Sequence, residues 1–133
     1  MILTDRVLNV EDDPMIALLV SRTFSIEGVE VQTATTVEGG LAALSETDRY
    51  AGLGKYTGLV LDYNLKDKFG TDIAIEARNR GYRGPIIIIS GGNLPEAVEK
   101  TKHLPNMAYL QKPVELDELV KTYKTLRDQT PKV

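Results

Sequence analysis

The chain has 133 residues and a net charge of −3, with 42% apolar residues, one histidine and no cysteine. This length and composition favour one folded domain, residues 1–133, with one core. The net negative charge argues against a basic surface that binds nucleic acid directly. The absence of cysteine excludes disulfides, thiolate metal sites and thiol nucleophiles. A lone histidine also excludes a multi-histidine metal site.

The chain carries no targeting or membrane pattern. No apolar run approaches the roughly 20 residues that cross a bilayer. The N-terminus lacks a cationic segment followed by an apolar one, as a secretory signal requires. We therefore expect a cytoplasmic protein without membrane contact.

Apolar runs alternate with helical patterns five times. The expected elements, in chain order, are a strand at Val7–Val10, a helix between Asp13 and Gly28, a strand at Val29–Thr33, a helix after Thr36, a strand at Leu59–Leu61, a helix at Thr71–Arg80, a strand at Ile86–Ile89, a helix at Asn93–Lys102, a strand at Met107–Leu110 and a helix at Glu115–Arg127. Asp13 and Pro14 suit a helix cap and first turn. Four consecutive isoleucines suit a central parallel strand that is covered on both faces.

Five strand-then-helix units predict an α/β fold. The sheet is expected to be parallel and doubly wound, with helices on both faces. Ligands of such sheets bind beyond the carboxyl ends of the strands. Between the second helix and the third strand, residues Thr47–Thr57 are expected to form a long polar and glycine-rich loop.

Polar residues follow four of the predicted strands. They are Glu11 and Asp12, Asp62, Ser90 and Lys112. Clustered carboxylates resist joint ionisation, and a hard cation with oxygen ligands, such as Mg²⁺, relieves the repulsion. A carboxylate is also a nucleophile that forms an aspartyl phosphate. A lysine would pair with the phosphate as a point charge.

Four segments carry a resemblance to a known family. They are "VLNVEDDP", "LVLDYNL", "IIIISGG" and "YLQKP". In this order they resemble the receiver domain of two-component response regulators, a CheY-like domain, over nearly the whole chain. The resemblance implies a flavodoxin-like sheet in the order 2-1-3-4-5.

The resemblance also implies a role for each site residue. The implied roles are Asp62 as phosphoacceptor and metal ligand, Glu11, Asp12 and the Asn64 backbone carbonyl as Mg²⁺ ligands, Lys112 and Ser90 as phosphate contacts, Ser90 and Tyr109 as the switch pair, and Gly70 as the glycine that opens the third helix. The peptide bond between Lys112 and Pro113 is expected to be cis.

The implied function is a phosphorylation switch and not an enzyme. The phosphoryl group would come from a histidine kinase or histidine phosphotransfer protein. A downstream protein target, or a fused output domain outside this chain, would respond. One alternative is a magnesium-dependent phosphatase with an aspartyl nucleophile, but Asn64 stands where such an enzyme needs a second carboxylate. The other alternative is a non-phosphorylated binding module, which the intact acid, hydroxyl and lysine set disfavours.

The chain departs from the family pattern in three places. Lys66 replaces the usual proline in the loop after the phosphoacceptor, and Phe69 replaces a common acid before Gly70. Both changes are expected to alter loop stiffness and partner choice. The loop Thr47–Thr57 is several residues longer than usual and is a candidate recognition loop.

Overall fold

The five strands form one parallel sheet. The structure is a computed structural model that describes residues 5–45 and 56–131. Its strands are β1 (Arg6–Val10), β2 (Glu30–Ala34), β3 (Gly58–Asp62), β4 (Ile86–Ser90) and β5 (Met107–Gln111). They lie in the order β2-β1-β3-β4-β5 with every neighbouring pair parallel. The predicted doubly wound, flavodoxin-like order is therefore confirmed.

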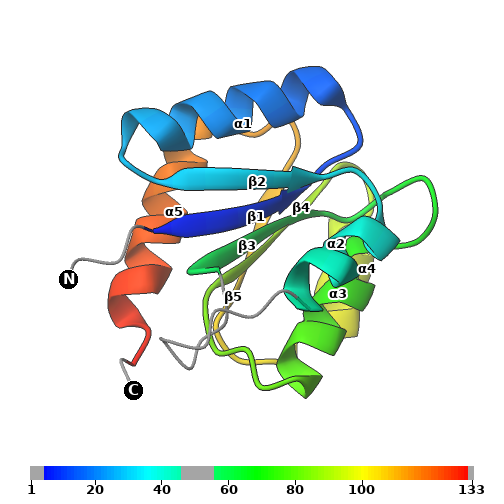
Figure 1. The fold of residues 1–133 in the computed structure, drawn as a ribbon. Helices are drawn as coiled ribbons and strands as arrows, with labels where there is room; N and C mark the ends of the chain where they lie inside the picture. The colour runs from blue at the N-terminus through cyan, green and yellow to red at the C-terminus, as the bar shows by residue number, and fades with distance from the viewer. Residues whose placement is uncertain (1–4, 46–55, 132–133) are drawn as a thin grey trace.

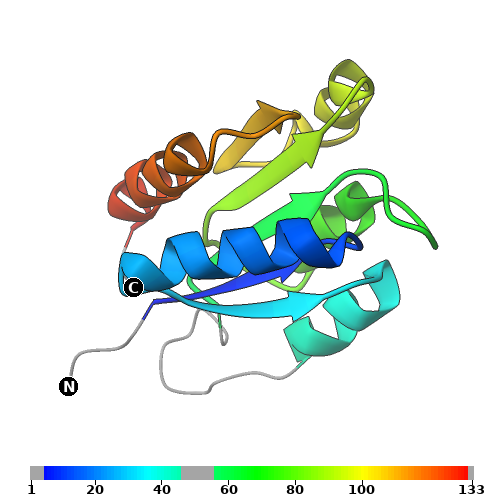
Figure 2. The ribbon, with the colours of Figure 1, turned by 90° about the horizontal axis from the view of Figure 1, so that it is seen from above.

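Five helices cover the two faces of the sheet. They are α1 (Pro14–Ile26), α2 (Val37–Ser45), α3 (Gly70–Asn79), α4 (Leu94–Thr101) and α5 (Leu116–Gln129). Helices α1 and α5 pack on one face, and α2, α3 and α4 pack on the other (Figures 1 and 2). Each face therefore has its own apolar core. No helix within residues 5–45 and 56–131 is long and apolar enough to span a bilayer.

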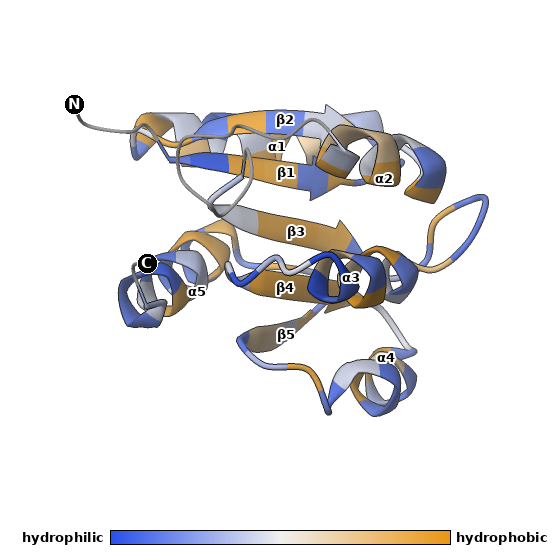
Figure 3. Ribbon diagram, turned by 60° about the horizontal axis from the view of Figure 1, so that its bottom comes forward, coloured by the Kyte–Doolittle hydropathy of each residue, from blue (hydrophilic) through white to orange (hydrophobic). Residues whose placement is uncertain are grey.

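The middle of the sheet is the most apolar part of the fold. Every residue of β3 and β4 is buried, and Figure 3 shows how apolar residues concentrate there. Leu59 and Leu61 face the α2–α4 side, whereas Val60 faces the α1–α5 side. Burial on both faces explains why these strands are continuous apolar runs.

The ends of α1 and the start of α2 follow the predicted signals. The Asp13 carboxylate accepts hydrogen bonds from the Met15 and Ile16 backbone N–H groups at 2.9 and 3.3 Å. Gly28 closes α1 with a φ of +79°, a conformation that favours glycine. Thr36 caps α2, because its Oγ1 accepts from the Gly39 N–H at 2.9 Å.

Strand β2 starts one residue later than predicted. The Val29 N–H donates to the Phe24 carbonyl at 3.0 Å, so Val29 takes part in the turn that closes α1 after Ile26. Glu30 then begins the ladder by pairing with Arg6.

The long loop predicted at residues 47–57 falls mainly on residues 46–55, which lie outside the described residues. Of that loop, only Tyr56 and Thr57 are described. Tyr56 is buried. The Thr57 Oγ1 accepts from the Arg6 N–H at 2.9 Å, which fixes the entry to β3.

Candidate functional site

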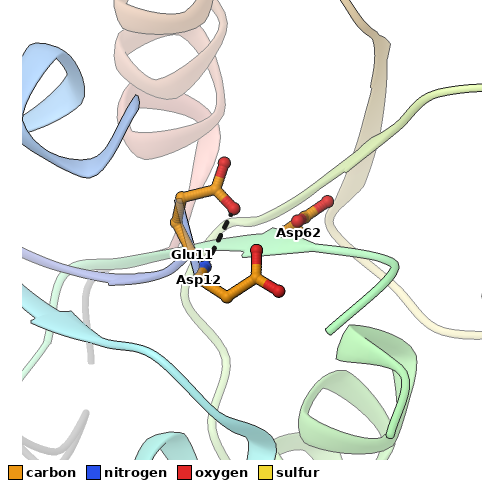
Figure 4. Close-up of side chains that lie close together, drawn as sticks. All are labelled: Glu11, Asp12 and Asp62. Carbon is orange, nitrogen blue, oxygen red and sulfur yellow. Dashed lines mark hydrogen bonds between the residues drawn. The ribbon is translucent and has the colours of Figure 1, made fainter. Parts of the chain in front are cut away.

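Three carboxylates meet at the carboxyl edge of the sheet. Glu11 and Asp12 directly follow β1, and Asp62 ends β3. One oxygen from each of the three side chains lies within 4.8 Å of the others (Figure 4). The parallel register of β1 and β3 places them there, since Val10 pairs with Leu61. The structure thus brings together the three acids that the sequence places at separate strand ends.

Glu11 is buried in this cluster, with 4% of its surface exposed. Its burial, together with a hydrogen bond to Asp62 and the charge of that carboxylate, raises the pKa of Glu11 to about 8. The nearby Lys112 ammonium opposes this rise. Crowded carboxylates with oxygen donors only are the ligand set that Mg²⁺ prefers. The residues present therefore fit a magnesium ion.

Lys112 reaches the same cluster from the loop after β5. Its Nζ lies 3.0 Å from Asp62 Oδ1 and 3.9 Å from Glu11 Oε1. Burial alone would lower the pKa of Lys112, but the Asp62 hydrogen bond and the surrounding carboxylates raise it overall. The Lys112 N–H donates to the Ser90 carbonyl at 2.8 Å, and the following peptide bond to Pro113 is cis, as expected.

Ser90 ends β4 with its side chain fully buried. Its Oγ has no hydrogen-bond partner within the part of the chain that the structure describes. A buried hydroxyl without a partner is unfavourable by about 1–3 kcal/mol. This position therefore suits a group that supplies an acceptor oxygen from the site.

The loop between β3 and α3 is folded tightly against Asp62. The Gly70 N–H donates to the Tyr63 carbonyl at 2.8 Å, and Asn64 bridges to Phe69 in antiparallel fashion. A side chain at Gly70 would place its Cβ 2.1 Å from the Asp62 carbonyl oxygen, so only glycine fits. These contacts hold Asn64, an exposed residue, close to Asp62.

Tyr109 on β5 is half-buried and points toward α4. Its hydroxyl lies 2.7 Å from Thr101 Oγ1. The Thr101 hydroxyl donates its one proton to the Ala97 carbonyl at 2.9 Å, so Tyr109 is the donor of the pair. The expected switch residue is therefore bonded to α4 in this structure.

The role of Asp67 was not predicted from the sequence. Its carboxylate accepts from the Val37 and Glu38 N–H groups at 3.0 and 3.2 Å and caps α2 from the β3–α3 loop. These backbone hydrogen bonds, that of Val37 first, lower the pKa of Asp67. Local capping patterns identify only residues adjacent to the helix, and Asp67 is 30 residues from Val37.

A pocket of about 480 Å³ lies beside the acids, between α1 and the start of α5. Its floor includes Glu11, Asp62 and Lys112, and its wall includes Ile16 and Leu19. Ile16 and Leu19 follow the helical apolar spacing of α1 but remain 37% and 45% exposed. The site is therefore entered past an apolar rim.

A family model and several known proteins match most of the chain. The family model of the response regulator receiver domain matches residues 7–124. The transcriptional regulatory protein AruR of Pseudomonas aeruginosa is 36% identical over 129 residues, covering 95% of this chain and 50% of that protein. The cell cycle transcriptional regulator CtrA of Caulobacter vibrioides is 31% identical over 118 residues, covering 86% of this chain and 47% of that protein. The chain spans about half the length of the curated relatives it matches.

Solved structures share the fold. A CheY-like receiver domain protein from Methanospirillum hungatei has a TM-score of 0.83 and 25% identity, covering 96% of both chains. The response regulator TrrA from Thermotoga maritima, in complex with Mg²⁺ and BeF, has a TM-score of 0.74 and 25% identity, covering 92% of this chain and 98% of that chain.

Proposed function

The chain belongs to the response regulator receiver domain family, and we propose that Asp62 is the residue on which it accepts a phosphoryl group. The observation that carries this proposal is the position of Lys112, whose Nζ lies 3.0 Å from Asp62 Oδ1 in the middle of the acid cluster. This pairing at the end of a central strand supports the proposal, because the same ammonium can contact the phosphoryl oxygens once the group is on Asp62.

The chemistry needs few groups. One Asp62 carboxylate oxygen attacks the phosphorus, the new P–O bond forms, and the bond to the donor breaks with its electron pair leaving on the donor. The Lys112 ammonium then pairs with the phosphoryl oxygens as a point charge. The buried Ser90 hydroxyl donates a hydrogen bond to one of these oxygens, and it has no other partner among residues 5–45 and 56–131.

We propose Glu11, Asp12, Asp62 and the Asn64 backbone carbonyl as the residues that hold Mg²⁺. When bound, the ion neutralises the charge that develops on the transferring group. The fold contributes by holding the three carboxylates close together. Glu11 must lose its proton to take part, because its pKa is about 8 without the ion.

We propose that the donor is a histidine kinase or a histidine phosphotransfer protein. The approach to Asp62 passes α1, where Ile16 and Leu19 line the pocket and are partly exposed, and where the preceding residue Met15 is exposed as well. Apolar groups at a rim of this kind suit a protein surface better than a free small molecule.

The output is proposed to pass to a protein target or to a segment outside these 133 residues. Ser90 and Tyr109 are the proposed switch pair. Ser90 ends β4 with a buried hydroxyl that has no partner among the described residues, and the Tyr109 hydroxyl hydrogen-bonds to Thr101 of α4. Some relatives are named transcriptional regulators. We propose that this domain, with a net charge of −3, makes no direct nucleic-acid contact itself.

A phosphatase is the second function that the acid cluster suggests. Such an enzyme needs a carboxylate two residues after its nucleophile to act as acid and base. Asn64 holds that position, and its amide does not titrate. The arrangement therefore favours a phosphoacceptor.

The test is mass spectrometry after incubation with acetyl phosphate and magnesium. The wild-type protein should gain one phosphoryl group, and Asp62→Asn should gain none. Asp72→Asn, which changes an exposed acid in the first turn of α3, is the control and should label like wild type. Labelling of Asp62→Asn at the wild-type level would show that another residue is the acceptor.

A further inference from the structure

Four side chains join the loop after Asp62 to α4. They are Tyr63 and Phe69 from the loop and Glu96 and Lys100 from α4, here called the loop–α4 cluster. The Tyr63 and Phe69 rings stack with centroids 4.9 Å apart and an interplanar angle of 22°. Lys100 Nζ lies 3.9 Å from the Phe69 centroid and 5.0 Å from that of Tyr63. The Tyr63 hydroxyl donates to Glu96 Oε2.

The cluster begins at the residue next to Asp62. Tyr63 is fully buried, and its N–H donates to the Ile89 carbonyl of β4 at 2.8 Å. Its backbone is thus fixed beside the site while its side chain contacts α4. Tyr63 therefore connects the backbone next to Asp62 with the side chain of Lys100 on α4.

Phe69 stands where a polar residue would cap the start of α3. It stands at the N-cap of α3, and no side-chain capping bond is made there among the described residues. A serine, threonine, aspartate or asparagine at this position would stabilise the helix. The chain gives up that bond and places an aromatic ring, 39% exposed, under a lysine of the neighbouring helix.

We propose that Phe69 and Lys100 are positioning residues that tie the β3–α3 loop to α4, so that occupancy of the site at Asp62 is coupled to the position of α4. This rests on the proposed function of Asp62. The contact is present while Lys112 is paired directly with Asp62, which is the arrangement without a phosphoryl group. The proposal requires that the contact is weaker once the site is occupied, so that it favours the arrangement in which Lys112 pairs with Asp62.

The experiment measures the affinity of the full chain for beryllofluoride in the presence of magnesium, by titration of amide shifts. Removing the contact with Lys100→Ala should raise the affinity about two- to fivefold, the range that a cation–π contact at an exposed site corresponds to. Lys100→Arg keeps a cation over the ring and should stay near wild type. Lys102→Ala removes the next lysine, which pairs with Glu99 instead, and should have no effect.

The same substitutions in a Phe69→Ser background separate coupling from stability. Serine offers α3 the capping bond that phenylalanine lacks, which offsets the lost ring contacts of Phe69, so this variant should unfold in urea near the wild-type midpoint. In that background Lys100→Ala should change the beryllofluoride affinity less than it does in the wild-type protein, because Phe69, the nearer of its two rings, is gone and only the Tyr63 contact at 5.0 Å remains.

Two results would overturn the coupling while leaving the proposed function intact. One is wild-type affinity in Lys100→Ala. The other is an equal effect of Lys100→Ala with and without Phe69, which would indicate general electrostatics. A wild-type protein that binds no beryllofluoride at all would overturn the proposed function and the coupling together.

Discussion

Glu11 has a raised pKa, and this has a consequence for stability. Its pKa is about 8 in the folded chain, because of burial and the neighbouring Asp62, against an ordinary pKa of 4.5. Between these two pH values the folded chain holds a proton that the unfolded chain has lost. The free energy of unfolding therefore falls as pH rises from about 4.5 to 8 and is level above that window.

Glu11→Gln should remove this fall in the free energy of unfolding, since glutamine has a similar shape and does not ionise. Without magnesium, we expect the variant to be more stable than wild type at pH 8 by on the order of 2 kcal/mol, with little difference near pH 4. Urea unfolding at several pH values measures it. Glu38→Gln changes an exposed glutamate of α2 and serves as the control. An equal difference from wild type at pH 4 and pH 8 would contradict the assignment.

Asp12 and Asp13 are neighbouring acids with different expected roles. Asp12 contributes an oxygen to the carboxylate cluster, whereas the Asp13 carboxylate is already bonded to the first turn of α1. Asp12→Ala should therefore weaken magnesium binding about tenfold or more, in line with changes around metal sites.

Asp13→Ala is the matched control for magnesium binding. It should lower stability by about 1 kcal/mol through the lost cap and leave the magnesium affinity close to wild type. Calorimetric titration at fixed pH distinguishes the two variants. Unchanged affinity in Asp12→Ala would remove that residue from the proposed ligand set.

At the scale of an element, the β3–α3 loop is held from both sides. Asp67 fixes it to the start of α2, and Phe69 fixes it to α4. The sequence contains Lys66 where the family usually has proline, which would stiffen the loop through its fixed φ. In this chain, side-chain contacts to α2 and α4 restrict the loop in place of the proline.

Gly70 sets how closely α3 approaches β3. An added Cβ would lie 2.1 Å from the Asp62 carbonyl oxygen, which is backbone and cannot turn away. Gly70→Ala should therefore destabilise the chain by about 2 kcal/mol, as overpacking does, and should reduce acetyl-phosphate labelling by displacing Asp62.

Gly91→Ala is the comparison for Gly70→Ala. Its added Cβ would meet no described atom within 4 Å, although Gly91 follows Ser90 directly. Labelling and the urea midpoint should both stay near wild type in this variant. If Gly70→Ala behaved like Gly91→Ala, the close approach of α3 would not be needed to hold Asp62.

At the scale of the whole molecule, much of the fold could be predicted from the sequence. The run Ile86–Ile89 predicts a central strand because burial on both faces removes any alternation. The alternation of strands and helices then places Glu11, Asp62 and Lys112 at one edge, because parallel strands share their direction. Those predictions rest on local patterns and on one topological rule.

The contacts of Phe69 and Asp67 could not be predicted in the same way. Phe69 meets Lys100, and Asp67 caps the start of α2, only after the sheet has folded. Neither pair has a characteristic spacing along the chain. The same limit applies to the pairing of Tyr109 with Thr101, which depends on how α4 packs against β5. Local patterns thus predict which residues meet at the carboxyl edge of the sheet better than they predict the contacts that support those residues.

The segment between α2 and β3 offers a test of which parts of the molecule the site needs. Strand β3 has five residues and runs from Gly58 to Asp62, which separates its two ends by roughly 16 Å. The chain enters β3 at the edge opposite the acids. Shortening a loop changes the closure free energy by only about 0.6 kcal/mol per halving of its length. We therefore expect the segment to be dispensable for phosphorylation and available for partner recognition.

Replacing residues 48–54 with a short glycine–serine linker should leave acetyl-phosphate labelling near the wild-type level. Tyr56 and Thr57 are kept, because Tyr56 is buried and the Thr57 hydroxyl lies 2.7 Å from the Tyr123 hydroxyl of α5. A matched variant with Thr57→Ala should be less stable, since the Arg6 N–H then loses its side-chain acceptor. Labelling is measured by mass spectrometry and folding by circular dichroism. A large loss of labelling in a folded, shortened chain would mean that residues 48–54 act at the carboxyl edge of the sheet.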